Sequence, residues 1–150
     1  MKIIKLLPFV LLILGCDGNL NVTPLAPALK SLPDFNFQIR TVSGMETIRQ
    51  SEYQRFELYV KQQGAEILAT DYIFEFSVTE FDGNIEFNKA IYRPNDQIRI
   101  PYTDLKKVQN LLYFNYYPIK PAVGVHTVTF SLKDAQKRVK SVQKKVVVVL

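Results

Sequence analysis

Cysteine, tryptophan and histidine are nearly missing from this chain of 150 residues, which contains one Cys, no Trp and one His. A secreted domain held together by disulfides needs an even set of cysteines, so that class is excluded. One histidine and one cysteine also leave a structural zinc site without its usual ligands. We therefore expect neither a metal ion nor a cofactor.

The chain also lacks an apolar run long enough for a transmembrane helix, which needs about 20 residues. Its longest run near the start extends from Leu6 to Leu14, is broken only by Pro8, and follows the basic residues Lys2 and Lys5. This arrangement is typical of the apolar region of a signal peptide.

The single cysteine stands directly after this run, in Ile13-Leu14-Gly15-Cys16. The stretch resembles the lipobox of bacterial lipoproteins, although Leu14 is larger than the usual residue there. The resemblance implies transfer of a diacylglyceryl group to the Cys16 thiol and cleavage after Gly15. Each buried acyl CH₂ contributes about 0.8 kcal/mol, so two or three chains anchor a protein to a membrane. We predict a lipoprotein signal peptide over residues 1–15 and lipid attachment at Cys16.

The chain also lacks a strong net charge. The chain has 19 Lys and Arg against 14 Asp and Glu, and removal of Lys2 and Lys5 leaves 17 against 14. This mild basic excess is unlike that of nucleic-acid-binding domains, so we expect no direct contact with nucleic acid. Ten Phe and eight Tyr are instead suited to β-sheets.

The remaining chain divides into a tether and a domain. Residues 16–33 contain three prolines and no sustained periodicity, which indicates a flexible tether. Over residues 34–150, apolar and polar residues alternate in short segments. These segments are 35–40, 55–61, 73–79, 84–88, 98–102, 112–117, 125–132 and 139–150. We predict one all-β domain, an immunoglobulin-like antiparallel β-sandwich of about seven to nine strands.

Local signals predict the connections. Asp82-Gly83 is a hairpin signal, and Pro94-Asn95-Asp96 and Asp134–Lys137 are turn signals. The stretch Thr103–Gln109 predicts one helical turn. Val146–Leu150 is apolar on both faces, so we expect cover on both sides of that strand.

No catalytic constellation is found. His126 falls at an inward strand position, which favours a buried structural histidine over a general base. Acidic residues gather between Asp71 and Glu86, and paired carboxylates can hydrolyse glycosides. Glu75 and Glu86 fit solvent-facing strand positions equally well. We expect a protein that is not an enzyme.

Two groups of residues are candidates for a partner surface. Tyr113 and Tyr117 should point outward from an aromatic strand, and exposed tyrosines are good contact residues. Lys137, Arg138 and Lys140 belong to a basic run that suits anionic headgroups or an acidic protein face. Each group also has an interpretation without a partner. The tyrosines fit an ordinary sheet face, and the basic residues fit a solvated hairpin whose lysines protect a sheet edge.

Several of these features together resemble the TraQ-like conjugal transfer lipoproteins of Bacteroides-type conjugative transposons, a family formerly described as a domain of unknown function. The shared features are the lipobox, the proline-bearing spacer, Pro94-Asn95-Asp96, the tyrosine-rich strand around Tyr113, and the strand His126–Phe130 that leads to Asp134. Family members commonly carry Gly after that aspartate, where this chain has Ala135. The resemblance implies an immunoglobulin-like sandwich and an accessory role in DNA transfer, with no active site to carry over.

The sequence therefore predicts a lipid-anchored envelope protein that acts as a non-catalytic binding or scaffold module for other envelope proteins. The alternative is a carbohydrate-binding or adhesive surface module, which the absence of Trp disfavours. Asp17 is followed by Gly18 and Asn19 rather than by further acids, and this favours a periplasm-facing protein. The partner's identity and the oligomeric state stay open.

Overall fold

The structure is a computed structural model that describes residues 34–62, 70–119 and 122–150. The predicted signal peptide, Cys16 and the predicted tether lie outside the described residues. Within these ranges, no helix has the length and apolar character that a bilayer crossing requires.

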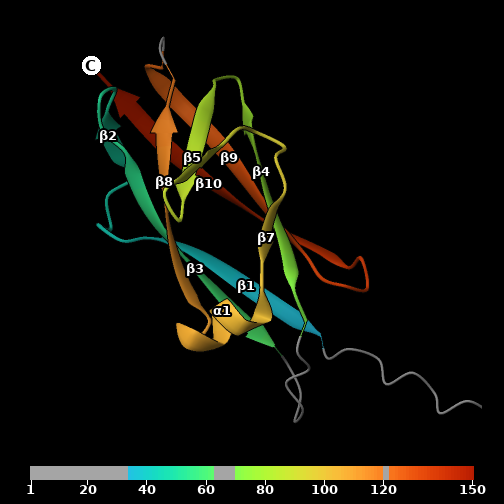
Figure 1. The fold of residues 1–150 in the computed structure, drawn as a ribbon. Coiled ribbons are helices and arrows are strands. Elements are labelled where there is room, and N and C mark those ends of the chain that lie inside the picture. The colour runs from blue at the N-terminus through green and yellow to red at the C-terminus, as the bar shows by residue number, and fades with distance from the viewer. Residues whose placement is uncertain (1–33, 63–69, 120–121) are drawn as a thin grey trace, which may run out of the picture. The chain divides into compact units, whose positions relative to one another are not determined.

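Ten strands and one short helix make up the described part of the chain (Figure 1). They are β1 (Phe35–Thr41), β2 (Thr47–Arg49), β3 (Gln54–Gln62), β4 (Tyr72–Thr79), β5 (Gly83–Phe87), β6 (Ala90–Tyr92), β7 (Ile98–Ile100), α1 (Tyr102–Lys107), β8 (Leu111–Pro118), β9 (Gly124–Lys133) and β10 (Val139–Val149). The predicted alternation is confirmed in the longer strands, where buried and exposed residues alternate. The two additional strands, β2 and β6, have three residues each, too few to show a period.

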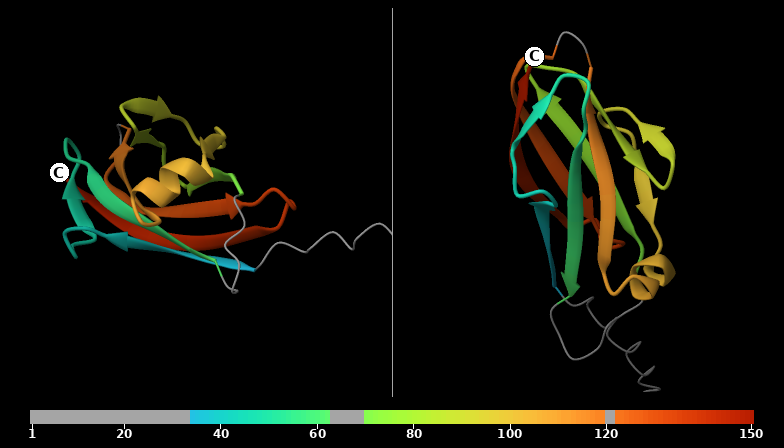
Figure 2. Two further views of the ribbon diagram at one scale, coloured as in Figure 1. Left: turned by 60° about the horizontal axis from the view of Figure 1, so that its bottom comes forward. Right: turned by 90° about the vertical axis from the view of Figure 1, so that its left-hand side faces the viewer.

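The strands form two five-stranded sheets that face each other, β1-β3-β8-β5-β6 and β2-β10-β9-β4-β7 (Figure 2). We call them the first and the second sheet. The order β1-β3-β8-β5 matches strands A, B, E and D of an immunoglobulin domain, and β10-β9-β4 matches G, F and C. The predicted all-β sandwich is confirmed. One pair is not antiparallel: β2 runs parallel to β10, because the chain changes sheets after β1 instead of forming a hairpin.

Four phenylalanines join the two sheets at the centre of the core. Phe56 and Phe114 come from the first sheet, and Phe74 and Phe130 come from the second. Ring centroids of the contacting pairs in this group lie 5.3–5.9 Å apart, in stacked, tilted and edge-to-face arrangements. Such aromatic pairs contribute about 0.5–1.5 kcal/mol each beyond the burial of their area.

The predicted helical turn is present as α1, and an aspartate fixes its start. The Asp71 carboxylate accepts a hydrogen bond from the Tyr102 backbone N–H at 3.0 Å and pairs with Arg99 at 2.6 Å. The backbone bond, and then Arg99, hold the pKa of Asp71 below its ordinary value. Leu105 is buried and docks the helix on the core. β7 ends at Ile100, directly before Pro101, and lies at the edge of the second sheet.

Two local predictions were wrong. Asp82-Gly83 does not close a hairpin, because β4 belongs to the second sheet and β5 to the first. Gly83 is needed there for a different reason: a Cβ at this position would overlap the Tyr116 ring. The last strand is also not covered on both faces. Val146 and Val148 are buried, β2 covers the strand edge, and Val149 is exposed.

Candidate interaction surface

The outer side of the first sheet carries a group of tyrosines that we call the tyrosine face. Tyr53 precedes β3, and Tyr113 and Tyr117 lie on the neighbouring strand β8. The Tyr53 and Tyr117 rings lie 5.4 Å apart, and the Arg55 guanidinium lies 4.9 Å from the centroid of Tyr113. The exposed fractions of Tyr53 and Tyr113 are 48% and 43%. The predicted outward orientation of Tyr113 and Tyr117 is therefore correct.

A carboxylate from β5 holds one of these tyrosines in place. Glu86 accepts hydrogen bonds from the Tyr117 hydroxyl at 2.7 Å and from the Asn115 side-chain amide at 3.0 Å. The Tyr117 bond, followed by the Asn115 bond, lowers the pKa of Glu86, and the same carboxylate raises the pKa of Tyr117. Tyr117 is half-buried as a result of this packing. A fixed aromatic ring loses little conformational freedom on binding a partner.

A hollow of about 190 Å³ lies beside Tyr113. Arg55, Lys89 and Glu86 contribute charges of both signs to its lining, together with Asn115. The tyrosine face therefore combines exposed rings with hydrogen-bonding groups, which is the composition of protein interfaces rather than of a purely apolar patch.

The basic residues predicted as a partner surface lie on a different sheet. Lys137 and Arg138 lie in the turn between β9 and β10, and Lys140 lies in β10 of the second sheet. The structure does not bring them together with Tyr113 and Tyr117. Lys137 is exposed at the tip of this turn and has a positive φ of 63°.

Two of these basic side chains are engaged inside the domain. Arg138 pairs with the buried Asp134 carboxylate at 2.6 Å, and Lys140 pairs with Asp34 at 2.9 Å. Both cations also lie near the Phe35 ring, at 5.8 and 5.7 Å. The Lys140 bond, the Phe35 backbone bond and these charges lower the pKa of Asp34. Arg138 and Lys140 thus fix the point where β1 begins, which sequence reasoning did not foresee.

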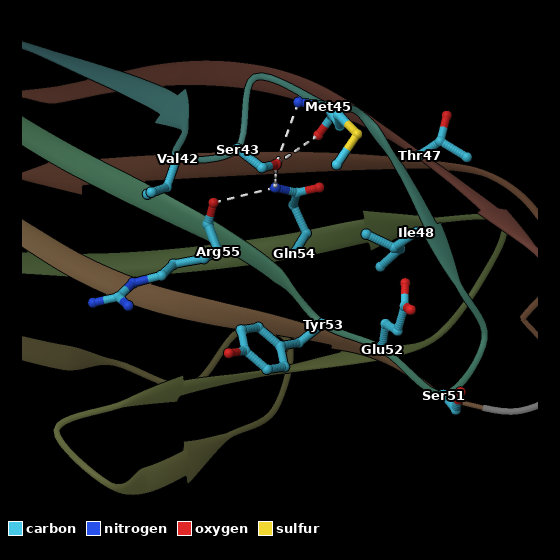
Figure 3. Close-up of a pocket in the computed structure, with 10 residues that line it drawn as sticks. All are labelled: Val42, Ser43, Met45, Thr47, Ile48, Ser51, Glu52, Tyr53, Gln54 and Arg55. Atoms are coloured by element: carbon cyan, nitrogen blue, oxygen red, sulfur yellow. Dashed lines mark hydrogen bonds between the residues drawn. The ribbon is translucent and has the colours of Figure 1, made fainter.

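The described residues also contain a groove that no sequence signal indicated. Its volume is about 510 Å³, and it lies where the chain passes from β1 to β2 and on to β3 (Figure 3). Val42, Met45 and Tyr53 are among its lining residues, and Gln54 closes its base. The groove arises from a change of sheet, and a local pattern carries no information about that change.

The single histidine occupies a buried position inside the domain, as predicted. His126 is completely buried, its Nδ1 lies 2.7 Å from the Tyr116 hydroxyl, and its Nε2 lies 2.6 Å from the Ala122 carbonyl oxygen. The carboxylates between Asp71 and Glu86 are divided between the two sheets. Within the described part of the chain, no cluster of three His, Cys, Asp or Glu side chains could hold a metal.

No protein-family model matches the chain, and a search of curated proteins finds no match either. Solved structures do match. A conjugative transposon lipoprotein from Bacteroides eggerthii has a TM-score of 0.60 at 13% identity, over 75% of this chain and 95% of that one. A conjugate transposon protein from Bacteroides vulgatus has a TM-score of 0.56 at 13% identity, over 81% and 91% of the chains.

A lipoprotein from Bacteroides thetaiotaomicron is similar as well, with a TM-score of 0.55 at 13% identity, over 75% of this chain and 80% of that one. The β-sandwich fold that the family resemblance implied is shared with these structures. At this level of identity, the similarity establishes a shared fold and leaves activity and partners to be argued from the residues.

Proposed function

We propose that this chain is a lipid-anchored envelope protein, a non-catalytic binding or scaffold module that serves as an accessory of conjugative DNA transfer. The observation that supports this most is the shared fold with a conjugative transposon lipoprotein and a conjugate transposon protein. The lipobox at Cys16 supports the membrane anchor, and the single acid after it supports an orientation toward the periplasm.

The tyrosine face is the surface we assign to the partner, another protein of the envelope. Tyr113 is exposed and carries Arg55 against its ring, and aromatic and arginine side chains dominate binding energy at protein interfaces. Tyr117 is already held by Glu86 in the free protein. A sugar stacked on Tyr113 competes with Arg55 for the ring, which favours a protein partner over a glycan.

The test is photocrosslinking in intact donor cells, with the full-length lipoprotein carrying benzoylphenylalanine in place of Tyr113. The matched control carries it in place of Thr127, which lies on β9 in the second sheet and is partly exposed. We expect components of the transfer apparatus to crosslink at position 113 and not at position 127.

Transfer frequency provides an independent readout. Tyr113→Ala should lower the frequency of DNA transfer by about tenfold, because truncation of an interface anchor commonly costs about 2 kcal/mol or more. Thr127→Ala should not change it. Crosslinks to polysaccharide-uptake or adhesion proteins instead would contradict the conjugation role. Loss of glycan-array binding in the Tyr113→Ala variant would show that the module binds sugars.

A further inference from the structure

The groove described above owes its shape to an interrupted strand pair. β1 and β3 are paired from Phe35 and Gln62 to Thr41 and Phe56, and the Val42 N–H then donates to the Arg55 carbonyl oxygen at 3.0 Å. Beyond this bond the chain leaves the first sheet and forms β2 beside β10. The start of β3 therefore has β8 on one side and the groove on the other (Figure 3).

A buried hydrogen-bond acceptor without a partner faces this groove. Gln54 is 1% exposed, and its Nε2 donates to the Arg55 carbonyl oxygen at 3.2 Å and to the Ser43 hydroxyl at 3.5 Å. A carbonyl oxygen only accepts, so the orientation of the amide is fixed. Within the described residues Oε1 has no partner, and Figure 3 shows it on the side of Thr47 and Ile48.

Leaving such an acceptor unpaired costs about 1–3 kcal/mol. A donor supplied by a ligand would remove that cost. The unpaired Oε1 of Gln54 therefore indicates a ligand with an N–H or O–H group, and this indication does not depend on the shape of the groove.

Open backbone edges of two strands also line the groove. The backbone N–H and C=O groups of successive residues in a strand point to alternate sides. In β3, the Arg55 carbonyl points toward β1, whereas the Val60 N–H donates to the Asn110 carbonyl oxygen on the β8 side. This alternation turns the Tyr53 backbone toward the groove, and no hydrogen bond reaches it from the described residues. On β2, Glu46 and Gln50 bond to β10, so the Thr47 backbone between them faces away from β10.

We infer that this groove binds an extended peptide segment of a partner protein, which adds as a strand beside β3 or β2 and donates a backbone N–H to Oε1 of Gln54. Edge strands with unpaired backbone groups are templates for such addition. The side chains at the rim suit an apolar segment, because Val42, Met45 and Tyr53 are 48%, 65% and 48% exposed. Arg55 and Glu52 line the same groove with opposite charges, so the peptide needs no particular net charge. This inference deepens the proposed function and rests on it for the protein nature of the partner.

The probe is a phage-displayed library of random ten-residue peptides, selected against the intact lipidated protein in detergent micelles. We expect selected peptides to carry apolar residues at alternate positions. Synthetic copies of a selected peptide are then made, each methylated on one backbone nitrogen. Methylation should weaken binding about tenfold at every second position and have no effect at the positions between, because every second N–H of an added strand faces the sheet.

Two variants test the groove itself. Gln54→Met keeps the size of the side chain and removes Oε1, and should weaken binding by about fivefold. Thr47→Pro removes an N–H that the fold does not use, which an edge strand tolerates, and should weaken binding by about tenfold. Thermal unfolding verifies that each variant folds. Thr127→Ala, on β9 in the second sheet, is the matched control and should bind like the wild type. The groove is tested by peptide binding and the tyrosine face by crosslinking in cells, so the two tests fail independently.

Other results would overturn the inference. Peptides that bind Thr47→Pro and Gln54→Met as tightly as the wild type do not use the groove. A synthetic peptide of residues 17–33 that outcompetes the selected peptides would assign the groove to the chain's own tether. A dimer in micelles that Thr47→Pro converts to monomers would assign it to a second copy. Failure of every library peptide to bind would reject a peptide site.

Discussion

The phenolic hydroxyl of Tyr116 donates a hydrogen bond to Nδ1 of His126 across 2.7 Å and thereby joins β8 in the first sheet to β9 in the second. The direction follows from the other ring nitrogen. Nε2 lies 2.6 Å from the Ala122 carbonyl oxygen, which only accepts, so Nε2 carries the proton and Nδ1 accepts. The Phe81 ring stacks on His126 at 4.4 Å, and burial raises the pKa of Tyr116 well above its ordinary value.

Tyr116→Phe tests this bond. The substitution removes only the hydroxyl and leaves Nδ1 of His126 as a buried acceptor without a donor. We expect the free energy of unfolding to fall by about 1–3 kcal/mol, measured by urea denaturation at pH 7. Tyr113→Phe on the exposed face is the control and should change stability by less than about 0.5 kcal/mol. Equal stabilities for the two variants would mean that the bond between Tyr116 and His126 contributes nothing.

Features set by local alternation could be predicted from the sequence. Phe56, Phe74, Phe114 and Phe130 occupy inward positions of regular strands, and all four are buried. The inward position of His126 followed from the same pattern. Where side chains alternate with a period of two, the face of each residue follows from the position of its neighbours.

Features set by distant parts of the chain could not be predicted. Asp82-Gly83 resembles a hairpin turn, but Gly83 is required because the Tyr116 ring lies against it. The two-residue hairpin turn is instead formed by Asn88 and Lys89. Both residues have a positive φ, although neither is a glycine. The orientation of Tyr113 on the candidate surface was predictable, whereas the groove at Gln54 depends on where β1 leaves its sheet.

Glu86→Gln should reduce the acid sensitivity of the fold. Hydrogen bonds from Tyr117 and Asn115 lower the pKa of Glu86 in the folded protein. A lowered folded pKa gives stability that is fully present above the unfolded value, about 4.3, and is lost as the pH falls through the folded value. The wild type should therefore lose more stability than Glu86→Gln between pH 6 and pH 3, measured as the shift in the urea midpoint.

The control for this experiment is Glu57→Gln on β3 of the same sheet. The Glu57 side chain makes no hydrogen bond or ion pair with the described residues. This variant should lose as much stability as the wild type between pH 6 and pH 3. Spectrophotometric titration gives a second readout. The Glu86 carboxylate raises the pKa of Tyr117, so Glu86→Gln should lower the pH at which this tyrosine ionises.

Lys137→Gly should stabilise the domain. Lys137 has a φ of 63° in the turn between β9 and β10, a left-handed conformation that costs a non-glycine residue about 1–2 kcal/mol. Glycine removes this cost but loses about 0.5–1 kcal/mol through the greater freedom of the unfolded chain. The expected net gain is about 0.5 kcal/mol in urea denaturation. Gln136→Gly, one residue earlier in the same turn, should destabilise by a similar amount, and a loss in both variants would contradict the explanation.

Cys16→Ser should release the protein from the membrane, because Cys16 is the only cysteine and so the only site for a thioether-linked lipid. After growth with an alkyne analogue of palmitate, wild type and Tyr113→Ala should both be labelled and remain in the membrane pellet after alkaline carbonate. Cys16→Ser should be unlabelled and enter the supernatant, since each lost acyl CH₂ removes about 0.8 kcal/mol of membrane affinity. A labelled or pelleted Cys16→Ser protein would show that the anchor lies elsewhere. If the domain faces the periplasm, added protease should degrade it only after the outer membrane is permeabilised.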